Sequence, residues 1–152
     1  VVATDINPNA IRCAAYNARE LGLESGLELR LVSPGAPGAF AVVGAQERFD
    51  LILSNPPWED QPPQSVAEFA LYDRNFALLK SLLAGLREHL NPDGRTLLAY
   101  GCVSAIHRLE SLAVEEGFTT RRLDDRDLSQ LPEVFLPGML IEVRLPRSGD
   151  AR

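Results

Sequence analysis

Five consecutive residues, Ser54-Asn55-Pro56-Pro57-Trp58, have the types and spacing best suited to chemistry in this sequence. The side-chain oxygen of Asn55 and the carbonyl oxygen of Pro56 are acceptors on a backbone that the prolines restrict. Together they can take both hydrogens of a planar –NH₂ group and aim its lone pair at an electrophile. The ring of Trp58 can stack on the flat group that carries this nitrogen. These five residues are called the motif below.

A short apolar run, residues 49–53, leads directly into the motif and predicts a buried strand. Prolines lack the N–H group that continues a sheet ladder, so we expect the strand to end there. In open α/β sheets, ligands bind outside the carboxyl ends of the strands. The alternative is that the motif is only a turn that ends the strand, with a packed tryptophan. That interpretation does not explain why a polar residue, two prolines and an aromatic residue occur together at the end of a strand.

A second candidate, Asp5, ends the first predicted strand, residues 1–4. An acidic side chain at such a place can accept hydrogen bonds from both hydroxyls of a ribose. It can equally cap the helix that Asn7 and Pro8 are expected to start. The residue alone does not decide between these interpretations, and a nicotinamide-dependent dehydrogenase could use the same aspartate.

The elements that must position these residues follow from the rest of the pattern. Because strands and helices alternate, we expect an α/β fold with a mainly parallel sheet and helices on both faces. The last two strands lack a helix between them, so they should pair antiparallel. Residues 1–145 are predicted to form one domain and residues 146–152 a flexible tail. Further strands are predicted at residues 27–32, 49–53, 96–100, 118–123 and 139–145, and helices at 8–21, 66–90 and 103–116.

The composition restricts the class of protein. A hydrophobic content of 45% with no membrane-length apolar run predicts a soluble protein without a membrane partner. The net charge of −6 argues weakly against a surface for non-specific nucleic-acid binding. Cys13 and Cys102 lie in apolar contexts, so we expect two buried thiols in a reducing, cytoplasmic compartment. His89 and His107 lack metal-ligand spacing to these cysteines, so no metal site is expected.

Residues 52–58 resemble the (Asn/Asp)-Pro-Pro-(Tyr/Phe/Trp) motif of class I S-adenosylmethionine-dependent methyltransferases that modify planar nitrogens. This group includes HemK-type release-factor glutamine methyltransferases, adenine amino-methyltransferases and the RNA guanine enzymes with a methyltransferase small domain. Residues 1–10 look like the second strand of these proteins, and residues 91–95 resemble the turn before their fifth strand. The resemblance covers nearly the whole chain and implies a Rossmann-like methyltransferase sheet with S-adenosylmethionine as the cofactor.

The resemblance also implies roles for individual residues. Asp5 takes the ribose-binding position, and Ile6 takes the place of a residue that packs on adenine. The acidic residue that the family commonly has after its third strand is absent, and Ser33 stands near that place. The implied cofactor-binding residues are Asp5, Ile6, Ser33, Ser54 and Asn55; the catalytic residues are Asn55, Pro56 and Trp58; and the acceptor is bound by Asn55, Pro56, Pro57 and Trp58.

The family's glycine-rich loop, which follows its first strand, is missing from the sequence. We therefore expect a chain truncated just before Val1, and a sheet that lacks the strand between residues 1–4 and 49–53. Such a fragment is expected to bind S-adenosylmethionine poorly and to be inactive by itself.

Three functions remain open at this point. A methyltransferase acting on a protein glutamine is slightly preferred because of the acidic balance, and an amino group of an RNA or DNA base is the alternative acceptor. A non-catalytic methyltransferase-like domain, serving as a binding or scaffold module, is the alternative of another class. A dehydrogenase would share Asp5 but gives no reason for the motif.

Overall fold

The computed structural model describes residues 1–146, so the predicted tail lies outside the described residues apart from Pro146. Strands alternate with helices along most of the chain, as the sequence pattern predicts. The strands are β1 (Val2–Asp5), β2 (Glu28–Leu31), β3 (Phe49–Ser54), β4 (Leu90–Cys102), β5 (Thr119–Arg122) and β6 (Val134–Arg144), and the α-helices are α1 (Pro8–Glu20), α2 (Ala77–His89) and α3 (Val103–Glu115).

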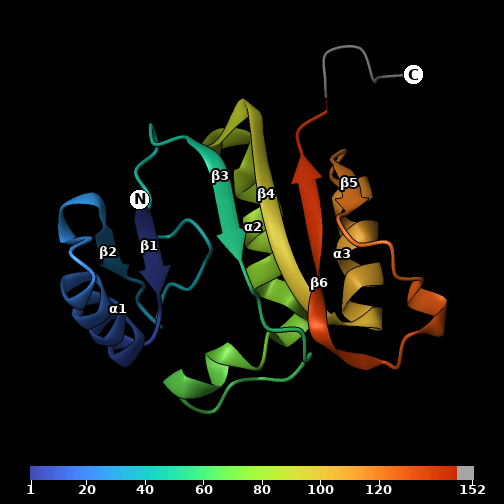
Figure 1. The fold of residues 1–152 in the computed structure, drawn as a ribbon, viewed down its shortest axis with the longest axis horizontal. Coiled ribbons are helices and arrows are strands. Elements are labelled where there is room, and N and C mark those ends of the chain that lie inside the picture. Colours follow the sequence, from blue (N-terminus) through green and yellow to red (C-terminus); the bar gives the residue numbers. More distant parts are fainter. Residues whose placement is uncertain (147–152) are drawn as a thin grey trace.

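The strands form two groups that stand side by side in Figure 1. In one group β1 pairs with β2 in parallel, and in the other the order is β3-β4-β6-β5. Within the second group β3 and β4 are parallel, while β6 runs against both of its neighbours, β4 and β5. The predicted fold class, a mainly parallel sheet with an antiparallel last strand, is confirmed. Among the described residues no strand pairing joins β1 to β3, the place where the resemblance puts one further strand.

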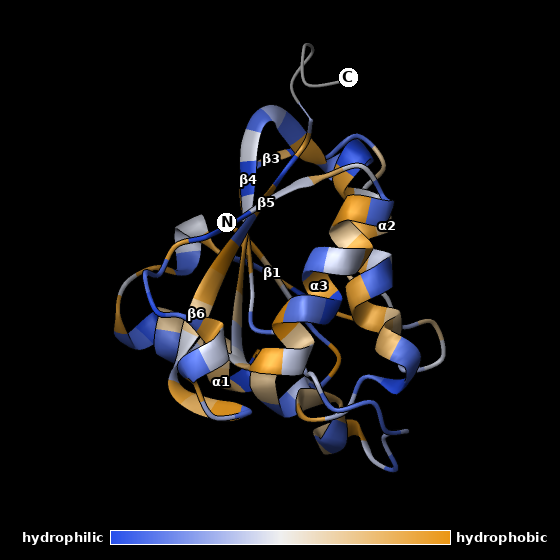
Figure 2. Cartoon of the chain, turned by 90° about the vertical axis from the view of Figure 1, so that its right-hand side faces the viewer, coloured by the Kyte–Doolittle hydropathy of each residue, from blue (hydrophilic) through white to orange (hydrophobic). Residues whose placement is uncertain are grey.

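Helices α2 and α3 lie together on one side of the four-stranded group, and α1 lies on the other side of the sheet (Figure 2). The main core is formed between α2, α3 and the inward side chains of β4 and β6. Leu79, Leu83 and Leu86 follow each other at helical spacing on α2 and are almost completely buried. Burying each such leucine contributes roughly 1.5–3 kcal/mol. Of the helices that the structure describes, none is both long and apolar enough to cross a membrane.

Helix α2 begins at Ala77, later than the predicted start near Val66. The preceding residues instead form two short 3₁₀ turns, Val66–Ala70 and Arg74–Phe76. Asn75 and Phe76 have φ angles of 57° and 54°, which a right-handed helix cannot include. The start of α2 is capped by the Asp73 carboxylate, which accepts hydrogen bonds from the N–H groups of Leu78 and Leu79 at 2.9 and 3.2 Å.

Two strands start earlier than predicted. β4 begins at Leu90 and runs through the predicted turn at residues 91–94, where its register against β3 shifts between Phe49 and Leu51. A bulge of this kind accommodates a proline and a glycine inside a strand. β6 begins at Val134 rather than at residue 139.

The two cysteines differ in burial. Both are free thiols, and Cys102 is buried, but Cys13 is exposed, so the prediction that both are buried is wrong for Cys13. The reason is that α1 packs with one face only, against β1 and β2: Ala18 is its one buried residue, and Cys13 lies on the outer surface.

An ion pair links β2 to the second strand group. Arg30 on β2 donates to Glu47 Oε1 at 2.7 Å and to the carbonyl oxygen of Val42 at 3.0 Å. The carbonyl oxygen of Glu47 in turn lies 2.9 Å from Nδ1 of His89, at the end of α2. The loop before β3 is therefore held from both sides.

The Arg30 guanidinium, followed by the N–H of Gly44, lowers the pKa of Glu47 to about 2 from its ordinary value of 4.5. A carboxylate with a lowered pKa stabilises the fold above its unfolded pKa and stops doing so as the pH falls toward the folded value. We therefore expect Glu47→Gln to lower the midpoint of urea unfolding at pH 7, and expect this difference from wild type to shrink steadily below pH 4.5. Glu116→Gln, which changes an exposed carboxylate, is the control. A difference that stays constant with pH would contradict a role for the Glu47 charge.

Candidate active site

The motif leaves the sheet where β3 ends. Ser54 still pairs with Leu98 of β4, and after it Pro56 and Pro57 are buried while Asn55 is exposed. Among the described residues the Asn55 side chain has no hydrogen-bond partner that would give it a role in the fold. An amide presented in this way, beside two buried prolines, is available to a ligand.

Trp58 is half-buried and packs against the main core. The next residue, Glu59, is also held in place, because its carbonyl oxygen accepts a hydrogen bond from the N–H of Asp73 at 2.9 Å. The motif is thus held at both ends, by β4 before it and by the start of α2 after it. One part of the indole ring anchors the segment, and the part that remains exposed can contact a bound group.

Asp5 makes a local contact before α1 and keeps one carboxylate oxygen without a partner in the described structure. Its Oδ1 accepts the N–H of Asn7 at 2.7 Å, and Asn7 in turn caps α1 by accepting the N–H of Asn9. Oδ2 of Asp5 makes no hydrogen bond to the described part of the chain, so it can still accept one from a hydroxyl. The local role therefore does not exclude the ligand role.

The predicted site residues lie at one edge of the molecule. β1 and β3 point the same way in Figure 1, so that Asp5 and Ser54 both stand at carboxyl ends. Ile6 follows Asp5 and is half-buried, while Ser33 is exposed two residues after β2 and accepts the N–H of Gly35 at 3.3 Å. The implied cofactor residues Asp5, Ile6 and Ser33 thus share the side of β1 and β2, and the motif occupies the side of β3.

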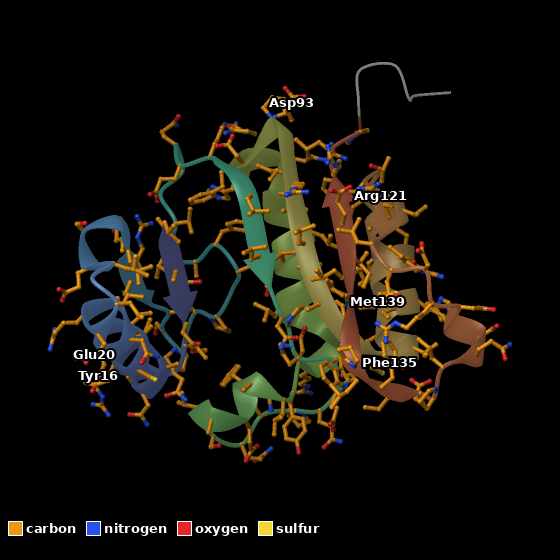
Figure 3. The ribbon with its side chains drawn as sticks, viewed as in Figure 1. Tyr16, Glu20, Asp93, Arg121, Phe135 and Met139 are labelled. Carbon is orange, nitrogen blue, oxygen red and sulfur yellow. The ribbon has the colours of Figure 1, made fainter. Side chains whose placement is uncertain are left out.

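Other polar side chains with possible chemistry have structural roles. Tyr100 is 2% exposed and belongs to the core. Arg122 forms two hydrogen bonds to Glu110, and Arg121 lies 3.3 Å from Glu142, so this basic pair is part of a mixed charged surface. In Figure 3, Arg121 lies toward the end of the sheet away from the carboxyl ends of β1 and β3.

Sequence reasoning missed how the segment after the motif is held. Residues 59–72, called the strap, form a loop whose two ends lie close together. Glu59 forms an isolated β-bridge with Tyr72, and its carbonyl oxygen accepts the N–H of Asp73. A second contact closes the base: the N–H of Asn75 donates to Asp60 Oδ1 at 2.6 Å. The only signal in the sequence was Asp73 itself, an acidic residue just before a strong apolar helical stripe.

Comparison with curated proteins finds two glutamine methyltransferases. The chain is 35% identical over 156 residues to a release factor glutamine methyltransferase of Cereibacter sphaeroides, which covers 95% of this chain and 51% of the relative. It is 33% identical over 111 residues to a ribosomal protein uL3 glutamine methyltransferase of Bradyrhizobium diazoefficiens, covering 66% of this chain and 33% of the relative. The chain thus spans about half the length of the first relative and a third of the second. No protein-family profile matches the sequence.

Among solved structures, a ribosomal protein L11 methylase from Lactobacillus delbrueckii subsp. bulgaricus superposes on 96% of this chain and 58% of its own, with a TM-score of 0.64 at 22% identity. The chain has a methyltransferase fold. The superposition includes nearly all of this chain but little more than half of the L11 methylase.

A substitution at Asn55 separates a ligand role from a structural one. Because its side chain is exposed and unpaired in the described structure, Asn55→Ala should change the free energy of unfolding by less than about 0.5 kcal/mol. Trp58→Ala, the comparison variant, removes a ring packed on the core and should cost about 1–2 kcal/mol. Urea unfolding followed by circular dichroism measures both. A large loss for Asn55→Ala would indicate that this side chain supports the fold.

Proposed function

We propose that the protein containing this chain is an S-adenosylmethionine-dependent N-methyltransferase whose acceptor is the side-chain amide of a protein glutamine. The observation that carries the proposal is the motif: an exposed Asn55, two buried prolines and a core-anchored Trp58 at the carboxyl end of β3. Asp5 at the same edge supplies a carboxylate oxygen for a cofactor hydroxyl. The fold and the two glutamine methyltransferase relatives support the same function.

S-adenosylmethionine supplies an electrophilic methyl group on a sulfonium. The residues present fit its nucleoside end, because Oδ2 of Asp5 is free in the described structure and Ile6 adjoins it. Ser33 and Ser54 stand at the ends of β2 and β3 and complete the proposed cofactor side. None of these four groups is suited to the charged methionine end, so other residues must hold that end.

The motif residues act on the acceptor. Oδ1 of Asn55 and the carbonyl oxygen of Pro56 each accept one N–H of the acceptor amide, which orients the nitrogen without removing a proton first. Pro57 restricts the backbone between these acceptors and Trp58, whose ring stacks on the amide plane. The contribution of these residues to the rate is positioning.

The choice of glutamine over a nucleobase rests on the relatives and on charge. Both curated relatives are named as glutamine methyltransferases, one of a release factor and one of a ribosomal protein. A net charge of −6 is unfavourable for a polyanionic acceptor. Nothing in the motif itself distinguishes an amide from a base amine, since both present a planar –NH₂ group.

Residues 1–145 act as a methyltransferase domain that needs one further parallel strand between β1 and β3. The edges that β1 and β3 turn to each other are unpaired within residues 1–146, and an unpaired edge offers N–H and C=O groups to another strand. Leu51 and Leu53 on β3 are 43% and 67% exposed, as expected for a strand whose apolar side chains would be buried by a further element. The proposed cofactor residues beside β1 and β2 and the proposed acceptor residues beside β3 thus lie on either side of these unpaired edges.

The chain by itself should therefore bind S-adenosylmethionine weakly. We expect isothermal titration calorimetry to give a Kd at least about 10²-fold weaker for residues 1–152 than for the complete protein, equivalent to about 3 kcal/mol of missing contacts. Equal affinities would contradict the need for a further strand at the cofactor site.

In the complete protein, Asn55→Ala should lower kcat for methyl transfer about 10²–10³-fold, a loss typical for removing one preorganised hydrogen-bonding group. The assay measures transfer of labelled methyl to release factors, ribosomal proteins, transfer RNA and ribosomal RNA in parallel. Gln46→Ala, which removes an exposed amide before β3, is the matched control and should leave kcat unchanged.

The acceptor panel also tests the alternatives. Labelling of RNA alone would overturn the glutamine assignment while leaving the reaction class intact. Full activity of a folded Asn55→Ala variant would overturn the role of the motif. Absence of transfer to every acceptor by a protein that binds S-adenosylmethionine would favour a non-catalytic binding module.

A further inference from the structure

The base of the strap is closed by backbone contacts directly after Trp58. The N–H of Asp73 donates to the carbonyl oxygen of Glu59 at 2.9 Å, and Glu59 forms an isolated parallel bridge with Tyr72. The N–H of Asn75 donates to Asp60 Oδ1 at 2.6 Å. A movement of residues 73–75 would therefore also move Glu59, the residue that follows Trp58 in the sequence.

Strained backbone follows these contacts. Asn75 and Phe76 both adopt left-handed conformations, with φ angles of 57° and 54°. Such a conformation costs a non-glycine residue roughly 1–2 kcal/mol, and a bulky residue such as Phe76 rarely adopts it. The pair persists only where neighbouring contacts hold it, and the contacts on either side are those of Asp73 and Asp60.

Asp73 supplies the larger number of these contacts. Its carboxylate accepts the N–H groups of Leu78 and Leu79 at the start of α2, while its own N–H holds Glu59. The residue is 5% exposed, and this burial raises the pKa of the carboxyl even though backbone donors act against it. A buried acidic group that serves only as a helix cap would be just as effective at the surface, where solvation favours its charge.

The main core contains a buried polar group on β4. The hydroxyl of Tyr100 on β4 is buried without a hydrogen-bond partner in the described structure. Burial first, and then the charge of Asp73, raise the pKa of the Tyr100 hydroxyl. Asp73 itself is fixed by two contacts: its carboxylate holds the start of α2, and its N–H holds Glu59.

We propose that Asp73 is a positioning residue for the motif. It ties the base of the strap to α2 and so determines where Trp58 and Asn55 stand relative to the sheet edge. Asp60 supports this tie through Asn75. The catalytic consequence rests on the proposed function, but the positional consequence does not.

Trp58 is the chain's one tryptophan, so its fluorescence reports the position of the motif without any ligand. In Asp73→Ala the emission should shift to longer wavelength and acrylamide should quench it more, because the ring leaves its packed position. Asp93→Ala removes an exposed carboxylate that Figure 3 places at the end of the sheet away from the site, and should leave both properties unchanged. Unchanged Trp58 fluorescence in a folded Asp73→Ala protein overturns the proposal.

Asp60→Ala provides a test that does not disturb the cap of α2. It removes the bond to Asn75 and leaves the bonds from Asp73 to Leu78 and Leu79. We expect the same shift in Trp58 emission, smaller in size, with unchanged helical circular dichroism. If Asp60→Ala has no effect on Trp58 and Asp73→Ala shifts it only in parallel with lost helical signal, Asp73 is a helix cap and nothing more.

In the complete protein, Asp73→Ala should lower kcat about 10²-fold, as expected for a displacement of about 1 Å at a positioned group, and leave the Kd for S-adenosylmethionine unchanged. Asp73→Asn, which keeps one acceptor oxygen, should restore part of this loss. A fluorescence shift without an effect on any methyl transfer would leave Asp73 as the residue that positions Trp58 and would count against the proposed function. Normal kcat together with normal fluorescence would count against the role of Asp73.

Discussion

The end of β3 at Ser54 is the constraint on which the rest of the site depends. Pro56 and Pro57 have no N–H to offer to β4, so the backbone must leave the sheet while β4 continues to Cys102. Both prolines are buried, which turns the segment inward and leaves the preceding Asn55 outside. An exposed amide that the fold does not use therefore lies within three residues of a half-buried indole ring that packs on the main core.

The regular elements could be predicted because their signals are local. The stop at Gly22, the leucine stripe of α2 and the stop at Gly117 each depend on residues within one or two turns, and both glycines have the positive φ that ends a helix. The antiparallel last strand followed from the missing helix between β5 and β6. The start of α2 was missed because the left-handed pair at Asn75 and Phe76 is set by contacts outside the helix.

The site could be predicted only in part, for a similar reason. The motif and Asp5 lie at strand ends that the pattern of apolar residues identifies. The tie from Asp73 to Glu59 joins residues across a strap rich in proline and polar residues, where no periodicity indicates which backbone groups meet. The sequence left Asp5 between a local cap and a ligand contact. In the structure one carboxylate oxygen accepts the N–H of Asn7, the residue that caps α1, and the other has no partner among the described residues.

The divided sheet has a consequence for the behaviour of the chain in solution. Within residues 1–146, β3 has one unpaired edge and two exposed leucines, and Asp50 is its single charged residue, so little on the strand itself discourages pairing with the edge of another molecule. β1 offers a second edge of the same kind. What opposes stacking of one molecule on the next is then the long-range repulsion of a net charge of −6, and this protection weakens as salt screens it or as acid neutralises the carboxylates.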